Sequence, residues 1–303
     1  MTIEPVQNTQ AQPKSGLIWL ASYPKSGNTW ARVFVSNLAA IMSGNAEAAD
    51  LNAIARFSHS ANYQTYFKEV LGFTPTAQHA DEIAAARAKV QQKIADAHEG
   101  LVFLKTHNAL AHDRGHPLFN FAVTSGAVYI VRNPLDVAIS LAHHGGDGLD
   151  KAIEVMASEN VVTPVDDIFV NEIWSSWSRH VWSWTRQAHP AIRVMRYEDM
   201  LADPLAAFTG LARHLQLAAS PEQLALAVDR SSFERLQDEE TREGFTEKPE
   251  RAGRFFREGR AGQWRDVLSR RQVDRVVAAH REQMARFGYW PLDRAPRNAG
   301  GLR

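Results

Sequence analysis

The chain alternates short apolar runs with segments in which apolar residues recur at helical spacing. Four runs have the length and the bounding residues of buried strands, and they cover residues 17–22, 101–106, 127–132 and 191–197. Helical spacing follows the first run from Thr29 to Met42, and a helix follows the third run through Leu141. Strands separated by helices form parallel sheets. The pattern therefore predicts an α/β fold with a P-loop-like central parallel β-sheet flanked by helices on both faces.

The segments between these runs complete the predicted arrangement. Residues 57–73 form an aromatic, irregular stretch, and an alanine-rich helix spans about 81–98. A helix over about 170–187 places on one face Trp174, Trp177, Val181 and Trp184, which favours core packing over contact with an aromatic substrate. A glycine-rich loop is expected at 143–148. After the fourth run the pattern is helical, except for residues 241–266, which are rich in glycine and charge.

We expect one domain from residue 16 to residue 292. Residues 1–15 are polar and show no apolar period, so they predict a disordered N-terminal tail, and residues 293–303 are expected to form a C-terminal tail. A chain of 303 residues is long enough to bury a large core. Its sequence contains neither internal repeats nor a sharp change in composition that would mark a domain boundary.

The composition narrows the class of partner. Lys and Arg number 34, and Asp and Glu also number 34, so no overall basic field favours nucleic acid or a membrane surface. The absence of cysteine excludes disulfides and thiolate chemistry and fits a reducing compartment. The polar start lacks the apolar region of a secretory signal, and no apolar run reaches the ~20 residues of a membrane span. We therefore expect a cytoplasmic enzyme that builds any anion site locally.

The segment SYPKSGNTW, residues 22–30, joins the first predicted strand to its helix. Its glycine lets the backbone approach a ligand closely, and the N–H groups from Ser26 to Trp30 point at an anion from the start of a helix. Nucleoside-triphosphate loops carry lysine where Asn28 stands, whereas here the positive charge is on Lys25. The segment predicts an anion site; the alternative is an ordinary strand–turn–helix with a solvated lysine.

The segment FLKTHNAL, residues 103–110, closes the second predicted strand. Lys105 and His107 are two residues apart on extended backbone and therefore project to the same side. A histidine with a pKa of ~6.5 is suited to take a proton from a hydroxyl near neutral pH. His107 is thus a candidate general base; the alternative is a hydrogen-bonded loop histidine.

Two further segments contribute arginines. In YIVRNPLDVAIS, Arg132 ends the third strand and Ser140 lies two turns along the next helix, which suits phosphate binding; the alternative is an ion pair between Arg132 and Asp136. In RFFREGRAGQWRD, arginines surround Gly259 and Gly262, which fits either a cover over a polyphosphate or a solvated loop. Polar groups after three of the four strands meet at the carboxyl edge of the sheet, where parallel sheets bind ligands.

In this order and spacing, the motifs resemble the cytosolic-type sulfotransferases that use 3′-phosphoadenosine 5′-phosphosulfate (PAPS). That family has YPKSGTTW after its first strand, then Lys-Thr-His, RNP-x-D-x-x-x-S, Tyr-Glu-Asp and a late RKG-x-x-G-x-W-K. The matching segments here are 23–30, 105–107, 132–140, 197–199 and 257–265. The resemblance covers about residues 17–290, and the chain is similar to a bacterial-like member of the family.

The resemblance implies a role for each matched residue. The 5′-phosphosulfate would lie against Lys25 and the backbone of Ser26, Gly27, Asn28 and Thr29, and the 3′-phosphate against Arg132, Ser140, Arg257 and Gly259. The adenine would lie among Trp30, Tyr197 and Phe233, with Ser231, Phe255 and Phe256 as further cofactor contacts. The catalytic set would be His107, Lys25, Lys105 and Ser140. His107 would take the proton from an acceptor hydroxyl or amine, and the lysines would supply the positive charge without a metal.

Sulfuryl transfer resembles phosphoryl transfer: an in-line displacement that depends on positioning and electrostatics. By the resemblance, Lys25 would stabilise the leaving phosphate of the product PAP, and Lys105 the moving sulfuryl group. Three residues depart from the family pattern. Asn28 loses one hydroxyl, Arg265 keeps the charge of a lysine, and Glu258 would weaken 3′-phosphate binding unless it points away. The family's dimerisation segment is poorly matched by Arg265, Ser269, Arg270 and Asp274, so either a monomer or a homodimer is expected.

The acceptor is expected to be a small hydrophobic or phenolic molecule. The candidates for its pocket are Phe57, Tyr63, Tyr66 and Phe67, together with the loop His143–Leu149. Two other functions stay open. A nucleotide-dependent phosphotransferase is opposed by Asn28 and by the lack of an evident magnesium carboxylate after a strand. An inactive PAP- or PAPS-binding protein is opposed by the presence of His107, Lys25 and Lys105.

Overall fold

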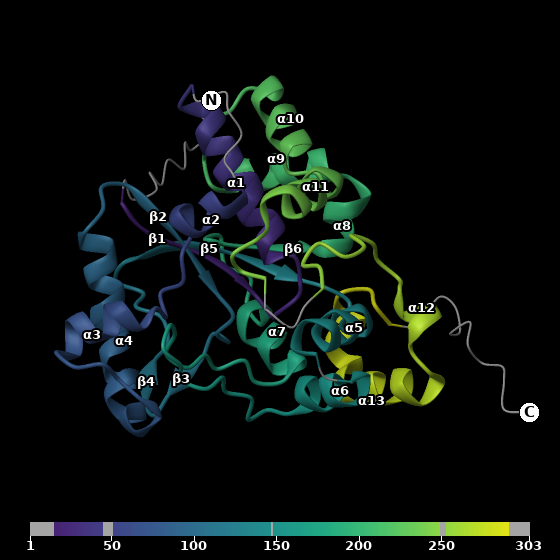
Figure 1. Cartoon of the computed structure of the whole chain (residues 1–303), viewed down its shortest axis with the longest axis horizontal. Helices are drawn as coiled ribbons and strands as arrows, with labels where there is room; N and C mark the ends of the chain where they lie inside the picture. Colours follow the sequence, from purple (N-terminus) through teal and green to yellow (C-terminus); the bar gives the residue numbers. More distant parts are fainter. Residues whose placement is uncertain (1–14, 45–50, 147, 249–252, 291–303) are drawn as a thin grey trace, which may run out of the picture.

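The sheet predicted from the sequence is present, with helices on both of its faces (Figure 1). The computed structural model describes residues 15–44, 51–146, 148–248 and 253–290. The predicted tails lie outside these residues, except for Ser15. Among the described residues, no helix has the length and apolar character needed to cross a membrane.

The sheet has four strands in the order β2-β1-β5-β6, and all neighbouring strands are parallel. They are β1 (Gly16–Ser22), β2 (Leu101–Thr106), β5 (Thr124–Val131) and β6 (Ile192–Arg196), close to the predicted bounds. A separate hairpin pairs β3 (His112–Asp113) with β4 (His116–Pro117). Because the strands are parallel, the segments that follow β1, β2 and β5 emerge at the same edge of the sheet.

Alternate residues of β1 pack on opposite faces of the sheet, as the period of a strand requires. On one face the core is shared with α1 (Asn28–Met42), α9 (Pro204–His214) and α10 (Pro221–Arg230). On the other face it is shared with α4 (Ala80–Asp96), α5 (Pro134–Gly145), α6 (Leu149–Ala157), α7 (Trp177–Thr185) and α13 (Arg270–Arg286). Figure 1 shows the first group above the strands and α5, α6, α7 and α13 below them.

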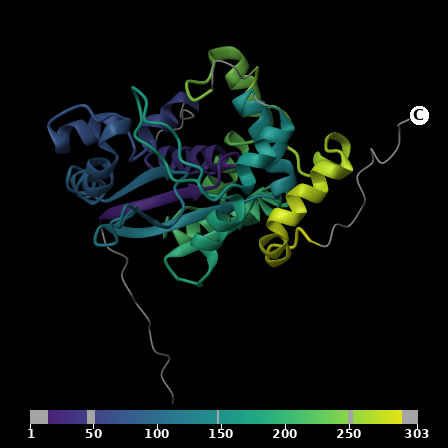
Figure 2. The ribbon, with the colours of Figure 1, turned by 90° about the horizontal axis from the view of Figure 1, so that it is seen from below.

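Shorter elements complete the described chain. They are α2 (Ile54–Phe57), α3 (Gln64–Leu71), α8 (Tyr197–Ala202), α11 (Phe233–Glu243) and α12 (Trp264–Val267), with single 3₁₀ turns at Leu51–Ala53 and Ala77–His79. In the view of Figure 2, α3 and α4 lie at one end of the molecule and α13 at the opposite end. The aromatic stretch predicted to be irregular therefore contains a helix, α3, which ends where Gly72 adopts a φ of 81°.

Two helix boundaries also differ from the prediction. The helix expected over 170–187 begins only at Trp177, because Ser176 caps it by accepting a hydrogen bond from the backbone N–H of Arg179 (3.2 Å). Trp174 thus lies outside the helix and off the predicted stripe. Helix α5 continues past Leu141 to Gly145, so His143 and His144 belong to its last turn rather than to a loop.

Candidate active site

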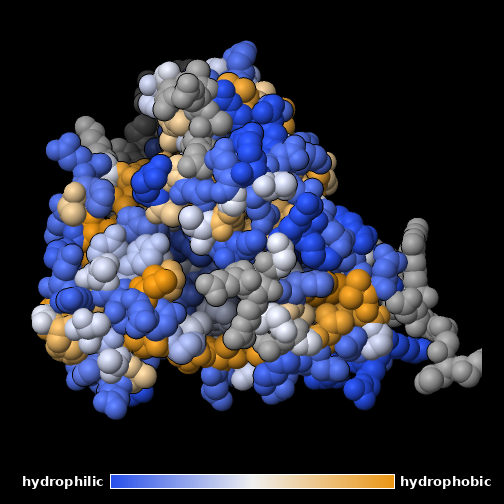
Figure 3. Space-filling view, viewed as in Figure 1, coloured by the Kyte–Doolittle hydropathy of each residue, from blue (hydrophilic) through white to orange (hydrophobic). Residues whose placement is uncertain are grey.

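A cleft of about 250 Å³ lies where the segments after β1, β2 and β5 meet. Its charged and polar lining includes Lys25, Asn28, Lys105, His107, Arg132, Ser140, His144, Glu247, Arg257 and Glu258. Its aromatic lining is Trp30, Trp174, Tyr197, Phe233, Phe255 and Phe256. Figure 3 shows that the surface is hollowed near the middle of the molecule in this view, where hydrophilic and hydrophobic surfaces meet. This is the edge at which parallel sheets bind ligands.

The loop between β1 and α1 curls tightly at the base of the cleft. Gly27 has a φ of 101°, and a Cβ atom there would lie 2.7 Å from the Tyr197 ring, so both the backbone and the packing require glycine. Lys25 also lies in the left-handed region, with a φ of 66°, which is strained for a residue with a side chain. The loop brings the N-terminus of α1 to the cleft, where its unpaired N–H groups and positive dipole end favour an anion.

Asn28 occupies the position at which nucleoside-triphosphate loops carry their lysine. Its side-chain Nδ2 donates a hydrogen bond to the carbonyl oxygen of Leu20 (2.8 Å), and the residue is buried. The amide therefore ties the start of α1 to strand β1. A positive charge at this end of the loop comes from Lys25 and not from residue 28.

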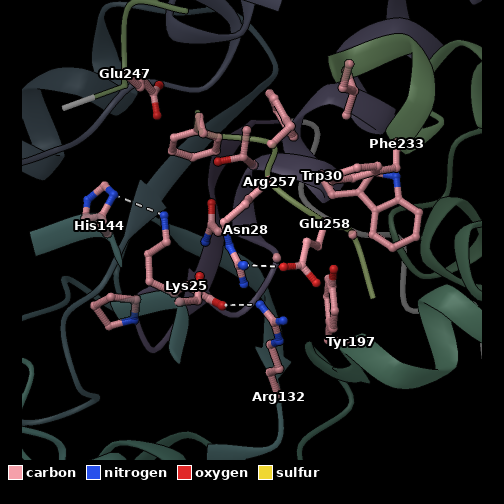
Figure 4. A pocket seen from close by; sticks show the side chains of 18 of the residues that line it. Lys25, Asn28, Trp30, Arg132, His144, Tyr197, Phe233, Glu247, Arg257 and Glu258 are labelled. Carbon is pink, nitrogen blue, oxygen red and sulfur yellow. Dashed lines mark hydrogen bonds and ion pairs between the residues drawn. The ribbon is translucent and has the colours of Figure 1, made fainter. Parts of the chain in front are cut away.

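Lys25 reaches across the cleft to the end of helix α5 (Figure 4). Its Nζ donates a hydrogen bond to Nδ1 of His144 (3.1 Å) and lies 4.4 Å from the centroid of the Phe255 ring. Burial lowers the pKa of Lys25 to about 7, and the positive charges of Arg132 and Lys105 add to the effect. Burial and the charge of Lys25 lower the pKa of His144 to about 4, so its imidazole is neutral and accepts the hydrogen bond. An anion bound here would restore the charge of Lys25.

Arg132 extends from the end of β5 into the same region. Its Nη1 donates to the carbonyl oxygen of Lys25 (3.0 Å), and its guanidinium lies 4.2 Å from the centroid of the Tyr197 ring. The alternative ion pair with Asp136 does not form. The Asp136 carboxylate instead accepts hydrogen bonds from the backbone N–H groups of Gly262 (2.7 Å) and Trp264 (3.0 Å). Asp136 thereby anchors the arginine-rich segment beside α5.

Glu258 lies in the cleft lining and does not point away from it. It forms an ion pair with Arg257, drawn in Figure 4, and another with Arg260 (2.6 Å between Nε and Oε2). Arg257 also donates to the side chain of Gln263. Glu258 neutralises part of the charge of Arg257. We therefore expect Arg257 to attract an anion less strongly than it would if a lysine stood at position 258, as in the family motif.

Aromatic side chains form the end of the cleft opposite His144 (Figure 4). The rings of Trp30 and Tyr197 meet edge to face at a centroid distance of 6.0 Å, and Phe233 lies beside them. Gly259 adopts a φ of 57°, and a Cβ atom there would lie 2.4 Å from the Phe233 ring. The arginine-rich segment therefore packs directly on the aromatic end, which is shaped to receive a flat apolar ring.

His107 is fixed by contacts on its ring and on both sides of its backbone. Its ring Nδ1–H donates to the carbonyl oxygen of Ser22 (2.8 Å), which leaves Nε2 as the acceptor nitrogen. Its backbone N–H donates to Oε1 of Glu172 (3.2 Å), and its carbonyl accepts from Nε2 of His180 (3.0 Å). Burial lowers the pKa of His107 to about 4, with Glu172 opposing and Lys105 adding to that effect. The neutral ring is ready to accept a proton at Nε2.

Glu247 brings a carboxylate to the cleft and is paired with two cations. Its oxygens accept hydrogen bonds from Nη1 (2.8 Å) and Nη2 (2.7 Å) of Arg32, and Lys105 Nζ lies 3.3 Å from Oε2. Arg32 is only 1% exposed and also donates to the side chain and backbone of Ser58. Burial alone would raise the pKa of Glu247, but Arg32 and Lys105 outweigh it and hold the pKa at about 2.

Residues 16–288 match the model of the sulfotransferase domain family. The chain belongs to this family. Similar curated proteins include 3-beta-hydroxysteroid sulfotransferase of Cavia porcellus, 25% identical over an alignment that covers 56% of this chain and 59% of that protein. Sulfotransferase 2B1 of Homo sapiens is 21% identical, with 99% of this chain and 74% of that protein covered. Luciferin sulfotransferase of Photinus pyralis is 25% identical, with 73% of this chain and 56% of that protein covered. The chain therefore spans little more than half the length of several of these relatives.

Solved structures support the same fold. Retinol dehydratase in complex with retinol and PAP superposes with a TM-score of 0.61 at 19% identity, covering 90% of this chain and 82% of that chain. Mouse SULT7A1 complexed with PAP gives a TM-score of 0.57 at 17% identity, covering 90% of this chain and 84% of that chain. At these identities the likeness establishes that this sulfotransferase domain has the fold of those proteins.

Most of the predicted cofactor and catalytic residues of the sulfotransferase domain line the cleft. They are Lys25, Gly27, Asn28, Thr29, Trp30, Lys105, His107, Arg132, Ser140, Tyr197, Phe233, Phe255, Phe256, Arg257 and Gly259. Ser26 and Ser231 lie behind the lining. The Ser26 Oγ is buried without a hydrogen-bond partner among the described residues. The Ser231 hydroxyl donates to the carbonyl of Ala227 (2.7 Å) and accepts from Asn37 (3.2 Å), so it is engaged in the core.

The structure does not place the predicted acceptor residues in the cleft lining, which includes none of Phe57, Tyr63, Tyr66, Phe67 and His143. The prediction for Phe67 is wrong: it is 1% exposed, lies in the core and packs near the Arg87 guanidinium. Phe57 stacks on Phe103 of β2 at a centroid distance of 5.2 Å. Aromatic composition alone does not distinguish rings that fill the core from rings that face a pocket.

Three residues that the sequence interpretation did not select belong to the site. Trp174 and Glu247 line the cleft, and Arg32 pairs with Glu247 behind it. His144, within the predicted acceptor segment 143–149, lines the cleft as well. Arg32 carries a usable signal, because it directly precedes the apolar run Val33–Val35 of a helix expected to pack on the sheet, and a buried arginine must be paired. Nothing in the sequence indicates that its partner lies more than two hundred residues away, at Glu247.

Proposed function

We propose that this sulfotransferase domain transfers the sulfuryl group of PAPS to a hydroxyl or amine of a small acceptor. The observation that carries the proposal is the meeting of His107, Lys25 and Lys105 in one cleft at the N-terminus of α1. This set combines a proton acceptor, cations for a transferring anionic group and a phosphate-binding loop. The presence of PAP in the structures of two relatives of similar fold supports the choice of donor.

The residues of the cleft fit PAP in charge and in shape. Arg132, which lines the cleft, and Ser26, which lies behind the lining, each have a buried polar atom (Nε and Oγ) without a hydrogen-bond partner among the described residues. The N-terminus of α1 with Lys25 would hold the 5′ end of the nucleotide. Arg132 and Arg257 would hold the 3′-phosphate, and the aromatic end formed by Trp30, Tyr197 and Phe233 would enclose the adenine.

The mechanism follows from the positions of the cleft residues. When bound, PAPS supplies the sulfuryl group and the leaving phosphate of an in-line displacement. His107 Nε2 takes the proton of the acceptor hydroxyl as its oxygen bonds to sulfur, and Ser22 holds the other ring nitrogen. Lys25 stabilises the charge that develops on the leaving phosphate oxygen, and Lys105 stabilises the equatorial oxygens of the moving group. Tight burial of these groups strengthens each of these interactions.

The acceptor class follows from the walls beside the base. Trp174 and Phe255 give this part of the cleft apolar faces, and both Lys25 and His144 lie beside the Phe255 ring. An acceptor with a flat apolar body and one nucleophilic hydroxyl fits these surfaces. We therefore propose small hydrophobic alcohols and phenols as the substrates, with PAP as the second product.

Ligand-dependent stability tests the proposed donor. We expect PAP at a hundredfold excess over its Kd to stabilise the folded protein by ~2.7 kcal/mol and so to raise the unfolding temperature, and ATP with Mg²⁺ to raise it little. Transfer of ³⁵S from labelled PAPS to 2-naphthol then tests the activity. A larger shift with ATP and Mg²⁺ would favour the phosphotransferase, and a PAP shift without transfer to any acceptor of a phenol and alcohol panel would favour an inactive binding protein.

The affinity for PAP is expected to fall as the pH rises above 7. The pKa of Lys25 is lowered to about 7 in the free protein, so above that pH the lysine must take up a proton when a phosphate anion binds. The second phosphate ionisation, with a pKa near ~6, is complete above pH 7.5 and does not interfere. Isothermal titration at pH 7.5–9 in buffers of different ionisation enthalpy should show proton uptake on PAP binding.

The matched variants for this prediction are Lys25→Met and Lys93→Met. Lys25→Met should bind PAP weakly and without proton uptake. Lys93 is half-exposed and pairs with Glu69 on the surface of α4, so Lys93→Met should retain both the affinity and the uptake. Equal proton uptake in wild type and Lys25→Met would show that another group titrates.

A further inference from the structure

A carboxylate outside the predicted catalytic set lies directly against the backbone of His107. Glu172 belongs to the connection between α6 and α7, and its Oε1 accepts hydrogen bonds from the His107 N–H (3.2 Å) and from Asn62 Nδ2 (3.0 Å). Its Oε2 accepts from Trp174 Nε1 (3.2 Å). All three donors are neutral N–H groups, so the negative charge of Glu172 is held in place by hydrogen bonds that do not cancel it.

Glu172 is held rigidly. Asn62, which donates to it, accepts a hydrogen bond from Nη1 of the buried Arg87 (2.9 Å). Arg87 also donates from Nη2 to the carbonyl oxygen of Asn171, next in the chain to Glu172 (2.7 Å). A single network thus runs from helix α4 through Asn62 to the carboxylate and on to His107. Such a network fixes the distance between a charge and a catalytic ring more precisely than a loop alone.

Apart from Glu172, the charged groups that shift the pKa of His107 are the cations Lys105 and Arg32, both of which also pair with Glu247. Lys105 on β2 and Arg32 on α1 both lower the pKa of His107, and Glu172 raises it. His180 on α7 is neutral, because burial lowers its pKa to about 3, and it donates to the His107 carbonyl. His144 on α5 is likewise neutral. When His107 accepts a proton, it becomes a cation close to Lys105 and Arg32, and the negative charge of Glu172 stabilises this protonated form.

We propose that Glu172 is a positioning residue that increases the basicity of His107 by stabilising its protonated ring and by fixing its backbone. The inference rests on the proposed function, in which His107 receives the acceptor's proton. The proton moves from the acceptor hydroxyl to Nε2 of His107 while the acceptor oxygen bonds to sulfur, and Glu172 itself stays ionised. Through Trp174, the same carboxylate orients one aromatic wall of the acceptor space.

The test compares Glu172→Gln, which removes the charge at nearly constant volume, with Glu172→Asp, which retains it. With PAP bound, the pKa of His107 is followed by NMR, its signal being assigned by its loss in His107→Ala. We expect this pKa to fall by about one unit in Glu172→Gln, a tenfold change in proton affinity. With PAPS and 2-naphthol, the acid limb of kcat should move to lower pH and its plateau should fall about threefold to tenfold. Glu172→Asp should retain most of the wild-type pKa of His107 and most of the wild-type pH profile of kcat.

Asp166→Asn is the matched control. Asp166 lies in the same connection, is exposed and accepts hydrogen bonds from the backbone N–H groups of Ile168 (2.8 Å) and Phe169 (2.7 Å), away from the base. It should change neither the His107 pKa nor the acid limb. A Glu172→Gln variant with an unchanged His107 pKa, or with lower kcat but an unmoved acid limb, would overturn the inference and leave a structural role. If Glu172→Gln does not fold, Glu172→Asp provides the test. The shorter side chain holds its carboxylate farther from the His107 ring, so the pKa of His107 must fall, but by less than the ~1 unit expected for Glu172→Gln.

The two proposals fail separately. If wild type transfers no sulfate to any acceptor, the proposed function fails, while the NMR titration in the PAP complex still measures the effect of Glu172 on His107. If wild type is active and Glu172→Gln behaves as wild type in both measurements, only the inference about Glu172 fails.

Discussion

The His107→Ala variant is expected to lose turnover by about 10²–10⁴-fold, the range that a general base contributes, while it still binds PAP. The ring is fixed by Ser22 at Nδ1, and the other ring nitrogen, Nε2, is the atom proposed to receive the proton. The groups proposed to bind phosphate, namely the start of α1 with Lys25 and the arginines, are separate from it, so the affinity for PAP should not change. Single-turnover kinetics with ³⁵S-PAPS and 2-naphthol, and titration calorimetry with PAP, measure the two properties independently.

Two further variants separate the loss of the base from loss of structure. His107→Gln retains much of the volume and should be as inactive as His107→Ala, whereas His112→Ala, in the exposed β3–β4 hairpin, should keep full activity. Added imidazole should restore part of the activity of His107→Ala by entering the space left by the ring. Near-full activity of His107→Ala across pH 6–9 would exclude His107 as the base.

The strands and the loop between β1 and α1 were predictable because each is formed by consecutive residues. A buried parallel strand is a short apolar run, and a turn that binds an anion needs a glycine and N–H groups at the start of a helix. Gly27 and Lys25 therefore stand out in the printed sequence, and the structure places both in the cleft. The same local information misplaced the start of α7, because the cap formed by Ser176 competes with the apolar period that continues before it.

The charged contacts of the site were not predictable, because they join residues far apart in the chain. Glu172 meets His107 and Glu247 meets Arg32 only after the sheet and its helices have assembled. Composition likewise gave the wrong environment for Phe67, since burial in the core and exposure in a pocket draw on the same aromatic residues. Sequence patterns thus define the cleft's edge, and the fold determines which charges meet there.

The Glu247→Ala variant is expected to lose about 3–5 kcal/mol in the free energy of unfolding, because it leaves the buried Arg32 without its anion. The Arg32 guanidinium makes two hydrogen bonds to the Glu247 carboxylate, at 2.7 and 2.8 Å, and the Arg32 side chain is almost wholly buried. Chemical denaturation followed by circular dichroism measures the loss. Glu243→Ala, four residues earlier on the surface, should change stability by no more than ~0.5 kcal/mol.

The double variant Arg32→Met/Glu247→Ala distinguishes an unpaired charge from lost packing. Since an apolar side chain of similar volume needs no partner, the double variant should recover much of the stability that Glu247→Ala loses. The pH gives a second criterion. Arg32 and Lys105 hold the pKa of Glu247 at about 2, below its ordinary 4.5, so the pair stabilises the protein fully above that ordinary value and progressively less as the pH falls toward 2. The stability difference between wild type and Glu247→Gln must therefore narrow over this acid range; a difference independent of pH would show that shape, and not charge, makes Glu247 important.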